Sequence, residues 1–222
     1  MKYSIVNLHY NESEADYRRA LQSIAYQTFK DYECICVDHA SISGLPVEEI
    51  VNEFGFSYLR LHENRLCGFG HNEAIKAAKG EYICFIDSDD FVMPDYLSLI
   101  DTFNQGEDVI FLGVQSFGDW KFQFVPGAEN TPKLSDFMFH ANFFKCIKRS
   151  FLIENDLWEL EGMVMSDYDL CKKIEKTLTS FSFVPEVIYM YQTGKPVTWV
   201  SDIDEVSRIH EEWSTAWEQK RK

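Results

Sequence analysis

The chain has 222 residues, of which 45% are hydrophobic and 26% are charged, and its formal net charge is −15. This composition is typical of a globular protein with enough chain to bury a substantial core. The strong negative charge argues against nucleic acid or an anionic membrane as the main partner, because both would repel the chain.

The first hundred residues alternate between short apolar runs and amphipathic segments. We expect strands over 3–9, 33–38, 56–61 and 82–86, and helices over 14–28, 45–54, 71–79 and 95–104. In the first helix, Ser13 is a suitable N-cap, and Tyr17, Leu21 and Ile24 form an apolar stripe. Alternation of this kind predicts an α/β fold with a mostly parallel central sheet flanked by helices.

Beyond about residue 105 the alternation becomes less regular. We expect strands over 108–114, 121–125, 181–184 and 187–191, and helices over 149–155, 167–178 and 203–219. The chain has no internal repeat, low-complexity tract or clear linker. We therefore expect one domain over residues 1–222, with a smaller, irregular second half after residue 105.

The cysteines and the chain ends bear on location. Six cysteines are scattered without the Cys-x-x-Cys spacing of zinc sites, which predicts free thiols in a reducing compartment. The N-terminus lacks a signal-peptide apolar region, and no stretch approaches 18 apolar residues. We expect a cytoplasmic protein. Its basic end, residues 219–222, is either a solvated helix end or a peripheral contact with the inner face of a membrane.

A buried-strand pattern ends abruptly in acidic residues, Asp87, Asp89 and Asp90. If extended backbone continues through Asp89, then Asp87 and Asp89 face the same side. Two such carboxylates repel each other, and a hard divalent cation that also binds substrate phosphates relieves this repulsion. Because open α/β sheets bind ligands at this edge, the stretch predicts a metal–diphosphate site. The alternative is an acidic turn in which Asp90 or a neighbour caps the helix that starts near Pro94.

A second acidic candidate lies at the start of the helix expected over 167–178. Ser166 and Asp169 have the spacing of a capping box, which leaves Asp167 without a structural role. Asp167 lies one turn before Leu170, on the apolar face of this helix. An inward carboxylate is costly unless it has a function, whereas a first-turn carboxylate can also simply pair with the helix dipole.

The segment Gly68-Phe69-Gly70 superficially suggests a phosphate-binding loop before a helix. The position of the third glycine of a dinucleotide-binding fingerprint is taken by Glu73, so the fingerprint is poorly supported. We expect a flexible turn here.

Several motifs together resemble those of the family-2 glycosyltransferases, which are nucleotide-sugar enzymes of the GT-A fold. In chain order the matching pieces are Ser4-Ile-Val, Tyr10-Asn11, Leu21-Gln-Ser-Ile24, Tyr32 to Asp38, His71-Asn72, Ala78 to Tyr82, Phe85-Ile-Asp-Ser-Asp-Asp90, Lys148 to Leu152 and Asp167-Tyr-Asp-Leu170. The resemblance covers most of the chain and favours the metal–diphosphate interpretation of the acidic cluster.

The resemblance implies that residues 1–105 bind a nucleotide-sugar, with a UDP-sugar the expected donor, and that residues 106–222 supply the acceptor side and the catalytic base. The positions that it assigns to the nucleotide-sugar are Asn11, Asp38, Asn72, Asp87, Ser88 and Asp89. It implies that Asp87 and Asp89 bind Mn²⁺ or Mg²⁺. It also implies that Asp167 is the general base of an inverting transfer to a glycan or a lipid-linked saccharide.

Three positions depart from the residues that are usual in that family. His39 replaces a second aspartate, His71 an arginine and Ser166 a glutamate. These departures keep open a catalytically degenerate protein that binds a nucleotide-sugar or glycan without turnover. A nucleotidyltransferase is a third possibility, but it would need a Gly-rich basic loop after the first strand, where this chain has Asn11-Glu-Ser-Glu14.

Overall fold

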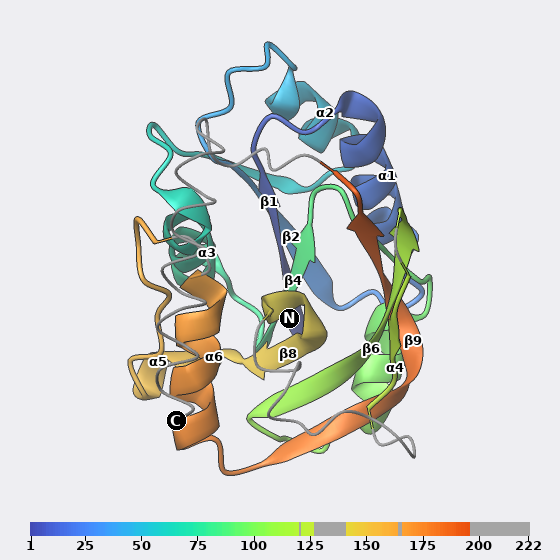
Figure 1. The fold of residues 1–222 in the computed structure, drawn as a ribbon, viewed down its shortest axis with the longest axis vertical. Helices are drawn as coiled ribbons and strands as arrows, with labels where there is room; N and C mark the ends of the chain where they lie inside the picture. Colours follow the sequence, from blue (N-terminus) through green and yellow to red (C-terminus); the bar gives the residue numbers. More distant parts are fainter. Residues whose placement is uncertain (120, 127–140, 164–165, 196–222) are drawn as a thin grey trace.

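The computed structural model describes residues 1–119, 121–126, 141–163 and 166–195, which form one curved sheet with helices on both sides (Figure 1). The helix expected over 203–219 and the basic end lie outside the described residues. No helix in the described part of the chain is long and apolar enough to span a membrane. The six cysteines are free, and all except Cys67 are buried.

The first half contains the expected parallel strands. Its elements are β1 (Tyr3–His9), α1 (Glu14–Ala25), β2 (Tyr32–Asp38), α2 (Val47–Glu53), β3 (Ser57–Arg60), α3 (Leu66–Ala77) and β4 (Tyr82–Asp87). The four strands lie in the order β3-β2-β1-β4, and each neighbouring pair is parallel. In register, His9 lies beside Asp38, and Leu8 lies beside Asp87. The carboxyl ends of β1, β2 and β4 therefore meet at one edge of the sheet.

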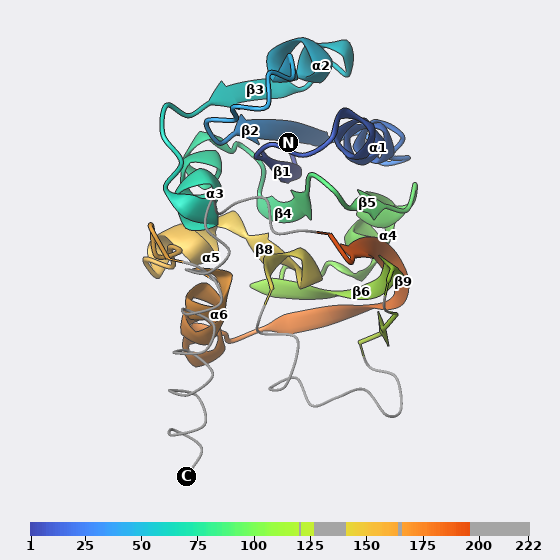
Figure 2. The ribbon, with the colours of Figure 1, turned by 45° about the horizontal axis from the view of Figure 1, so that its top comes forward.

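The second half extends the same sheet beyond β4. Its elements are β5 (Phe91–Val92), α4 (Tyr96–Phe103), β6 (Val109–Gly118), β7 (Gln123–Phe124), η1 (Asn142–Phe144), β8 (Lys145–Lys148), α5 (Arg149–Glu154), α6 (Ser166–Thr177) and β9 (Phe181–Thr193). β8 runs antiparallel to both β4 and β6, whereas β9 is parallel to β6. Figure 2 shows α3, α5 and α6 on one side of the sheet and α1 and α4 on the other. The expected α/β fold is confirmed.

The two strands expected over 181–184 and 187–191 are one continuous strand, β9, so this prediction was wrong. The pairing of β9 with β6 shifts in register around Gly113. A Cβ at this position would lie 1.9 Å from the carbonyl oxygen of Glu186. Because Gly113 has no side chain, β9 can approach β6 closely at the register shift and continue as one strand.

Helix α1 follows the sequence pattern closely. Ser13 caps it by accepting a hydrogen bond from the backbone N–H of Asp16 at 3.2 Å. Its buried residues include Tyr17, Leu21 and Ile24, which form the predicted stripe. The helix ends at Ala25, three residues before the expected end.

Helix α3 begins at Leu66 rather than at residue 71, so the flexible turn expected at Gly68-Phe69-Gly70 was wrong. A Cβ on Gly68 would lie 2.6 Å from the carbonyl oxygen of Leu160, and one on Gly70 would lie 2.5 Å from Cδ1 of Leu8. These glycines allow the helix to pack closely against β1 and against the segment that contains Leu160. Their role is close packing rather than a special backbone conformation.

Candidate functional site

The acidic cluster after β4 forms a tight turn. The strand ends at Asp87, and the backbone N–H of Asp90 donates to the carbonyl oxygen of Asp87 at 3.2 Å. Ser88 and Asp89 occupy the turn, and Ser88 is buried there. The condition under which Asp87 and Asp89 would face the same side, extended backbone through Asp89, is not met, because the turn begins immediately after Asp87.

Asp90 anchors this turn to β9. Its buried carboxylate accepts a hydrogen bond from the hydroxyl of Tyr189 at 2.5 Å and another from the backbone N–H of Gln192 at 2.6 Å. The capping alternative was wrong, because the N-cap residue of α4 is Asp95, which makes no side-chain cap bond. The third carboxylate of the acidic turn, that of Asp90, therefore holds the turn against β9.

Helix α1 braces the turn from the other side. The Nη2 atom of Arg19 donates to the backbone carbonyl of Asp89 at 2.5 Å, while Nη1 pairs with Asp16 at 2.9 Å. Lys195 also forms an ion pair with Asp16. The turn is thus held by contacts with α1 and β9 that use the backbone of Asp89 and the side chain of Asp90. These contacts do not use the carboxylates of Asp87 and Asp89, which remain available to bind a ligand.

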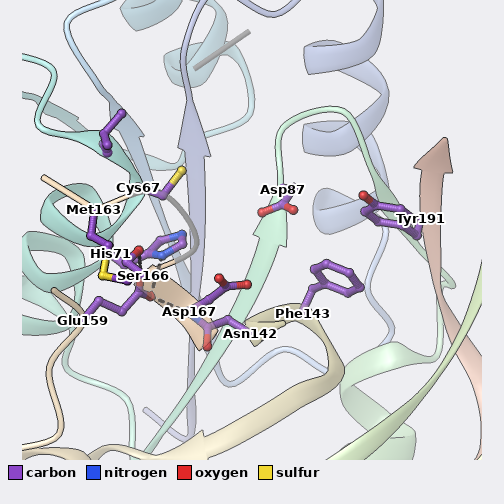
Figure 3. Close-up of a pocket in the computed structure, with 11 residues that line it drawn as sticks. Cys67, His71, Asp87, Asn142, Phe143, Glu159, Met163, Ser166, Asp167 and Tyr191 are labelled. Carbon is purple, nitrogen blue, oxygen red and sulfur yellow. Dashed lines mark hydrogen bonds and ion pairs between the residues drawn. The ribbon is translucent and has the colours of Figure 1, made fainter. Parts of the chain in front are cut away.

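A cavity of about 230 Å³ opens beside this turn, between α3, β4, η1, α6 and β9. Asp87 and Asp167, which are far apart in the sequence, both line it. Figure 3 shows their carboxylates pointing into the same space. Asp89 does not line this cavity, although its charge acts on Asp87.

The surroundings shift the protonation of the acidic residues. Burial, followed by the charge of Asp89, raises the pKa of Asp87 from its ordinary 3.8 to about 7. Burial, followed by the charge of Glu159, raises the pKa of Asp167 to about 6. Burial also raises the pKa of Asp89, against the opposing charge of Lys195. A carboxylate with a pKa just below neutrality is suited to act as a general base.

The donor set available for a metal ion consists of carboxylate oxygens, which are the ligands that Mg²⁺ and Mn²⁺ accept. Among the described residues, no group of three or more His, Cys, Asp or Glu side chains is arranged to hold an ion. The carboxylates of Asp87 and Asp89 are ligands of this type, and a cation held by them would take its remaining ligands from water and a substrate diphosphate, as Mg²⁺ commonly does.

Glu159 is the centre of a buried network that the sequence analysis missed. Its carboxylate lies 2.7 Å from Nδ1 of His71 and accepts hydrogen bonds from Nδ2 of Asn142 and Oγ of Ser166, both at 2.5 Å. Burial alone would raise the pKa of Glu159, but the nearby His71 and these hydrogen bonds hold it below its ordinary value. In the sequence, the only signal was a single acid between the apolar residues Trp158 and Leu160.

Asn72 contributes to the same network through the backbone. Its Nδ2 donates to the carbonyl oxygen of Glu159 at 2.9 Å, and its Oδ1 accepts from the backbone N–H of Glu159 at 3.1 Å. This two-point contact fixes the segment of Glu159 against α3. Asn72 was expected at the nucleotide-sugar and here supports the wall of the cavity.

The capping box expected at the start of α6 was wrong. Ser166 donates its hydroxyl to Glu159, and Asp169 forms an ion pair with Lys173 at 2.6 Å. The buried carboxylate of Glu159 competes successfully for the Ser166 hydroxyl. Asp167 lies between these two residues and lines the cavity, on the inward side that the helix periodicity predicted.

Asn11 and Asp38 both hold the loop that follows β2. Asp38 is buried and accepts hydrogen bonds from the backbone N–H of Ser41 and from the hydroxyl of Tyr58, both at 2.9 Å, and from Arg60. Burial would raise the pKa of Asp38, but these donors outweigh it and hold the pKa below its ordinary value.

Asn11 adopts a left-handed backbone conformation, with φ of 59°. Its Oδ1 accepts hydrogen bonds from the backbone N–H groups of Ile42 at 2.8 Å and Ser43 at 3.0 Å. Because β1, β2 and β4 are parallel, Asn11 and Asp38 lie at the same sheet edge as Asp87. The side chains of Asn11 and Asp38 bond to the protein's own loop.

Comparison with known proteins gives the class of this chain. The family model of Glycosyl transferase family 2 matches residues 4–157. The chain resembles the structure of S. aureus TarS 1–349 in complex with UDP-GlcNAc, with a TM-score of 0.78 and 22% identity over 91% of this chain and 61% of that one. The fold is thus that of a GT-A glycosyltransferase, as the motifs implied.

The chain belongs to glycosyl transferase family 2. It is 28% identical to the amylovoran biosynthesis glycosyltransferase AmsB of Erwinia amylovora over 86% of this chain and 69% of AmsB. It is also 27% identical to the poly(ribitol-phosphate) beta-N-acetylglucosaminyltransferase TarS of Staphylococcus aureus strain Mu50, over 88% of this chain and 36% of that relative. The chain thus spans about a third of the length of that TarS.

Proposed function

We propose that this chain is an inverting, metal-dependent glycosyltransferase that moves a sugar from a nucleotide-diphosphate donor, a UDP-sugar, to a hydroxyl group of a glycan or lipid-linked saccharide. The observation that carries the proposal is that Asp87 and Asp167 point into one cavity at the carboxyl edge of the sheet. The TarS structure with UDP-GlcNAc supports the choice of donor, because its fold is the same.

The donor side is assigned to the strand ends of the first half. Asp87 and Asp89 would hold Mn²⁺ or Mg²⁺, which supplies positive charge to the leaving diphosphate. Asn11, Asp38, Asn72 and Ser88 are assigned to the nucleotide-sugar site, the first two at the ends of β1 and β2. Since Asp38 already accepts hydrogen bonds from Tyr58 and Arg60, a ribose hydroxyl would join or displace these donors.

The chemical step is assigned to Asp167. Its carboxylate takes the proton from the acceptor hydroxyl as that oxygen attacks the anomeric carbon. The bond between the anomeric carbon and the diphosphate oxygen breaks, and the leaving nucleoside diphosphate keeps the electron pair. Attack from the side opposite to the leaving group inverts the anomeric configuration and needs no covalent enzyme intermediate.

A nucleotide-sugar panel with and without Mn²⁺, scored by released nucleoside diphosphate, tests this proposal. We expect metal-dependent release from one donor, its loss in Asp89→Ala, and loss of turnover with donor binding retained in Asp167→Asn. Metal-dependent nucleotide binding without turnover, when acceptors are supplied, would support the degenerate alternative. Absence of both binding and turnover would overturn the enzyme assignment.

A further inference from the structure

Two stacked aromatic side chains, Phe143 and Tyr191, line one side of the cavity. The ring of Phe143 stacks on that of Tyr191 with centroids 4.8 Å apart and an interplanar angle of 14°. It also stacks on Tyr189 at 5.1 Å and 20°. Tyr189 is fully buried, whereas Phe143 and Tyr191 are partly exposed and line the cavity. We call the pair Phe143 and Tyr191 the aromatic wall.

The aromatic wall is well supported from behind. Tyr189 places its hydroxyl between the backbone N–H of Asp87 and the carboxylate of Asp90, so its ring is fixed. Tyr191 lies two residues further along the same strand, on the same face of β9. The orientation of the wall is therefore set by the same contacts that hold the acidic turn.

Three acidic side chains also line the cavity. Asp87, Glu159 and Asp167 line it, and among its described lining residues His71 alone can carry a positive charge. His71 is already paired with Glu159. An anionic group that entered this space without its own cation would be repelled by these carboxylates.

We propose that the aromatic wall binds the ring of the acceptor, and that the acceptor is a neutral pyranoside rather than an open-chain polyol phosphate. This inference rests on the proposed function. One face of a pyranose presents C–H groups with partial positive charge, which pack against the negative face of an aromatic ring. The hydroxyl groups at the edge of the sugar then reach the carboxylates, including Asp167.

Phe143 links the wall to the residues around the candidate base. Phe143 directly follows Asn142, which binds Glu159 together with Ser166, the neighbour of Asp167. The hydroxyl that Asp167 deprotonates must lie in the cavity that Asp167 lines, so the ring that carries it lies within reach of this apolar surface.

The test uses the donor found in the panel, with methyl glucopyranoside, methyl galactopyranoside and methyl mannopyranoside as acceptors and ribitol 5-phosphate as the open-chain competitor. We expect at least one pyranoside to accelerate nucleoside diphosphate release and ribitol 5-phosphate to leave it unchanged. Tyr191→Ala should raise the acceptor KM about two- to tenfold more than the donor KM, because the apolar face of the sugar loses an aromatic contact. Tyr191→Phe should restore the acceptor KM, because the ring remains.

The controls separate the possible failures. Tyr26→Ala, at an exposed tyrosine remote from the cavity lining, should leave both KM values unchanged. Acceleration by ribitol 5-phosphate alone, or a Tyr191→Ala effect confined to the donor KM, would overturn the inference and leave the proposed function standing. Absence of nucleoside diphosphate release from every donor, with and without acceptor, would instead remove the proposed function and the inference with it.

Discussion

The Nδ1 atom of His71 lies 2.7 Å from Oε1 of Glu159, and both side chains are buried. Burial by itself would lower the pKa of His71, but the charge and hydrogen bond of Glu159 outweigh it and raise the pKa. The pair therefore favours a charged imidazole at a position where the family usually has arginine. A positive group at this place depends on a glutamate that lies far away in the sequence.

We expect Glu159→Gln to lower the free energy of unfolding by about 3 kcal/mol at pH 7, because it removes one charge from a buried pair and weakens three hydrogen bonds. The stabilisation should fade as the pH rises through the folded pKa of His71, which lies above its unfolded value. Urea unfolding at pH 6 and pH 9 measures both effects. The control is Glu161→Gln, which affects a surface pair with Arg65 and should cost at most about 1 kcal/mol. Equal small losses in both variants would contradict the prediction.

The pKa of Asp167, raised to about 6, predicts the acid limb of the pH profile. Since a general base must be deprotonated, we expect kcat to fall as the pH drops through about 6. The rate of sugar transfer measured between pH 5 and pH 8 checks this limb. A rate that stays level down to pH 5 would argue against Asp167 as the base.

The raised pKa of Asp167 also predicts that the protein becomes more stable when the charge of this side chain is removed. Because the folded pKa of Asp167 lies above its ordinary 3.8, the charged form costs stability once the pH exceeds that value. We expect Asp167→Asn to raise the free energy of unfolding by about 1–2 kcal/mol at pH 8 and to change it little at pH 4. Asp169→Asn, which loses an ion pair with Lys173, should bring no gain. Thermal unfolding at the two pH values distinguishes these outcomes, and a loss of stability in Asp167→Asn at pH 8 would contradict the prediction.

Divalent cations should stabilise the folded protein if Asp87 and Asp89 bind them. An ion that binds only the folded state raises Tm, and it must displace the proton that Asp87 holds below a pKa of about 7. We therefore expect Mn²⁺ together with a nucleoside diphosphate to raise Tm more at pH 8 than at pH 6. Chelation should reverse the shift, and Asp89→Ala should abolish it. If the rise in Tm were unchanged in Asp89→Ala, the ion would have to bind elsewhere.

Lys145 is a buried lysine behind the candidate base. Its Nζ donates to Sγ of Cys171 at 3.0 Å, and its positive charge opposes the rise in the pKa of Asp167. We expect Lys145→Met to raise this pKa further and to move the acid limb of the rate profile to higher pH. Lys148→Met, at a more exposed lysine on the same strand, should leave the limb in place. An unshifted limb in Lys145→Met would show that the charge of Lys145 does not reach Asp167.

The glycines of α3 provide a test of the fold. We expect Gly68→Ala to destabilise the protein by about 1–3 kcal/mol, because the new Cβ would lie 2.6 Å from a backbone oxygen of Leu160 that cannot easily move. In the flexible turn that the sequence suggested, or in an open helix, the same change would be neutral or stabilising. Urea unfolding of this one variant distinguishes the two situations.

Much of the architecture could be predicted because the patterns that specify it are local. The apolar stripe and Ser13 cap of α1, the apolar run of β4 and the alternation through residue 103 depend on neighbouring residues. The meeting of Asp38 and Asp87 at one sheet edge follows from parallel pairing alone. The family also followed from the sequence, because its motifs are short and keep their order.

The tertiary structure alone decided which partner each polar group takes. Asp90 binds β9 rather than capping α4, and Ser166 binds Glu159 rather than Asp169, because a buried partner from a distant segment outcompetes a local one. Gly68 and Gly70 proved to be packing residues because the chains that approach them come from elsewhere in the fold. The sequence by itself thus determined most of the elements of the first half, the family and the candidate carboxylates. Contacts between distant residues decided the Glu159 network, the aromatic wall and the cavity shared by Asp87 and Asp167. Such contacts cannot be predicted from the spacing of residues along the chain.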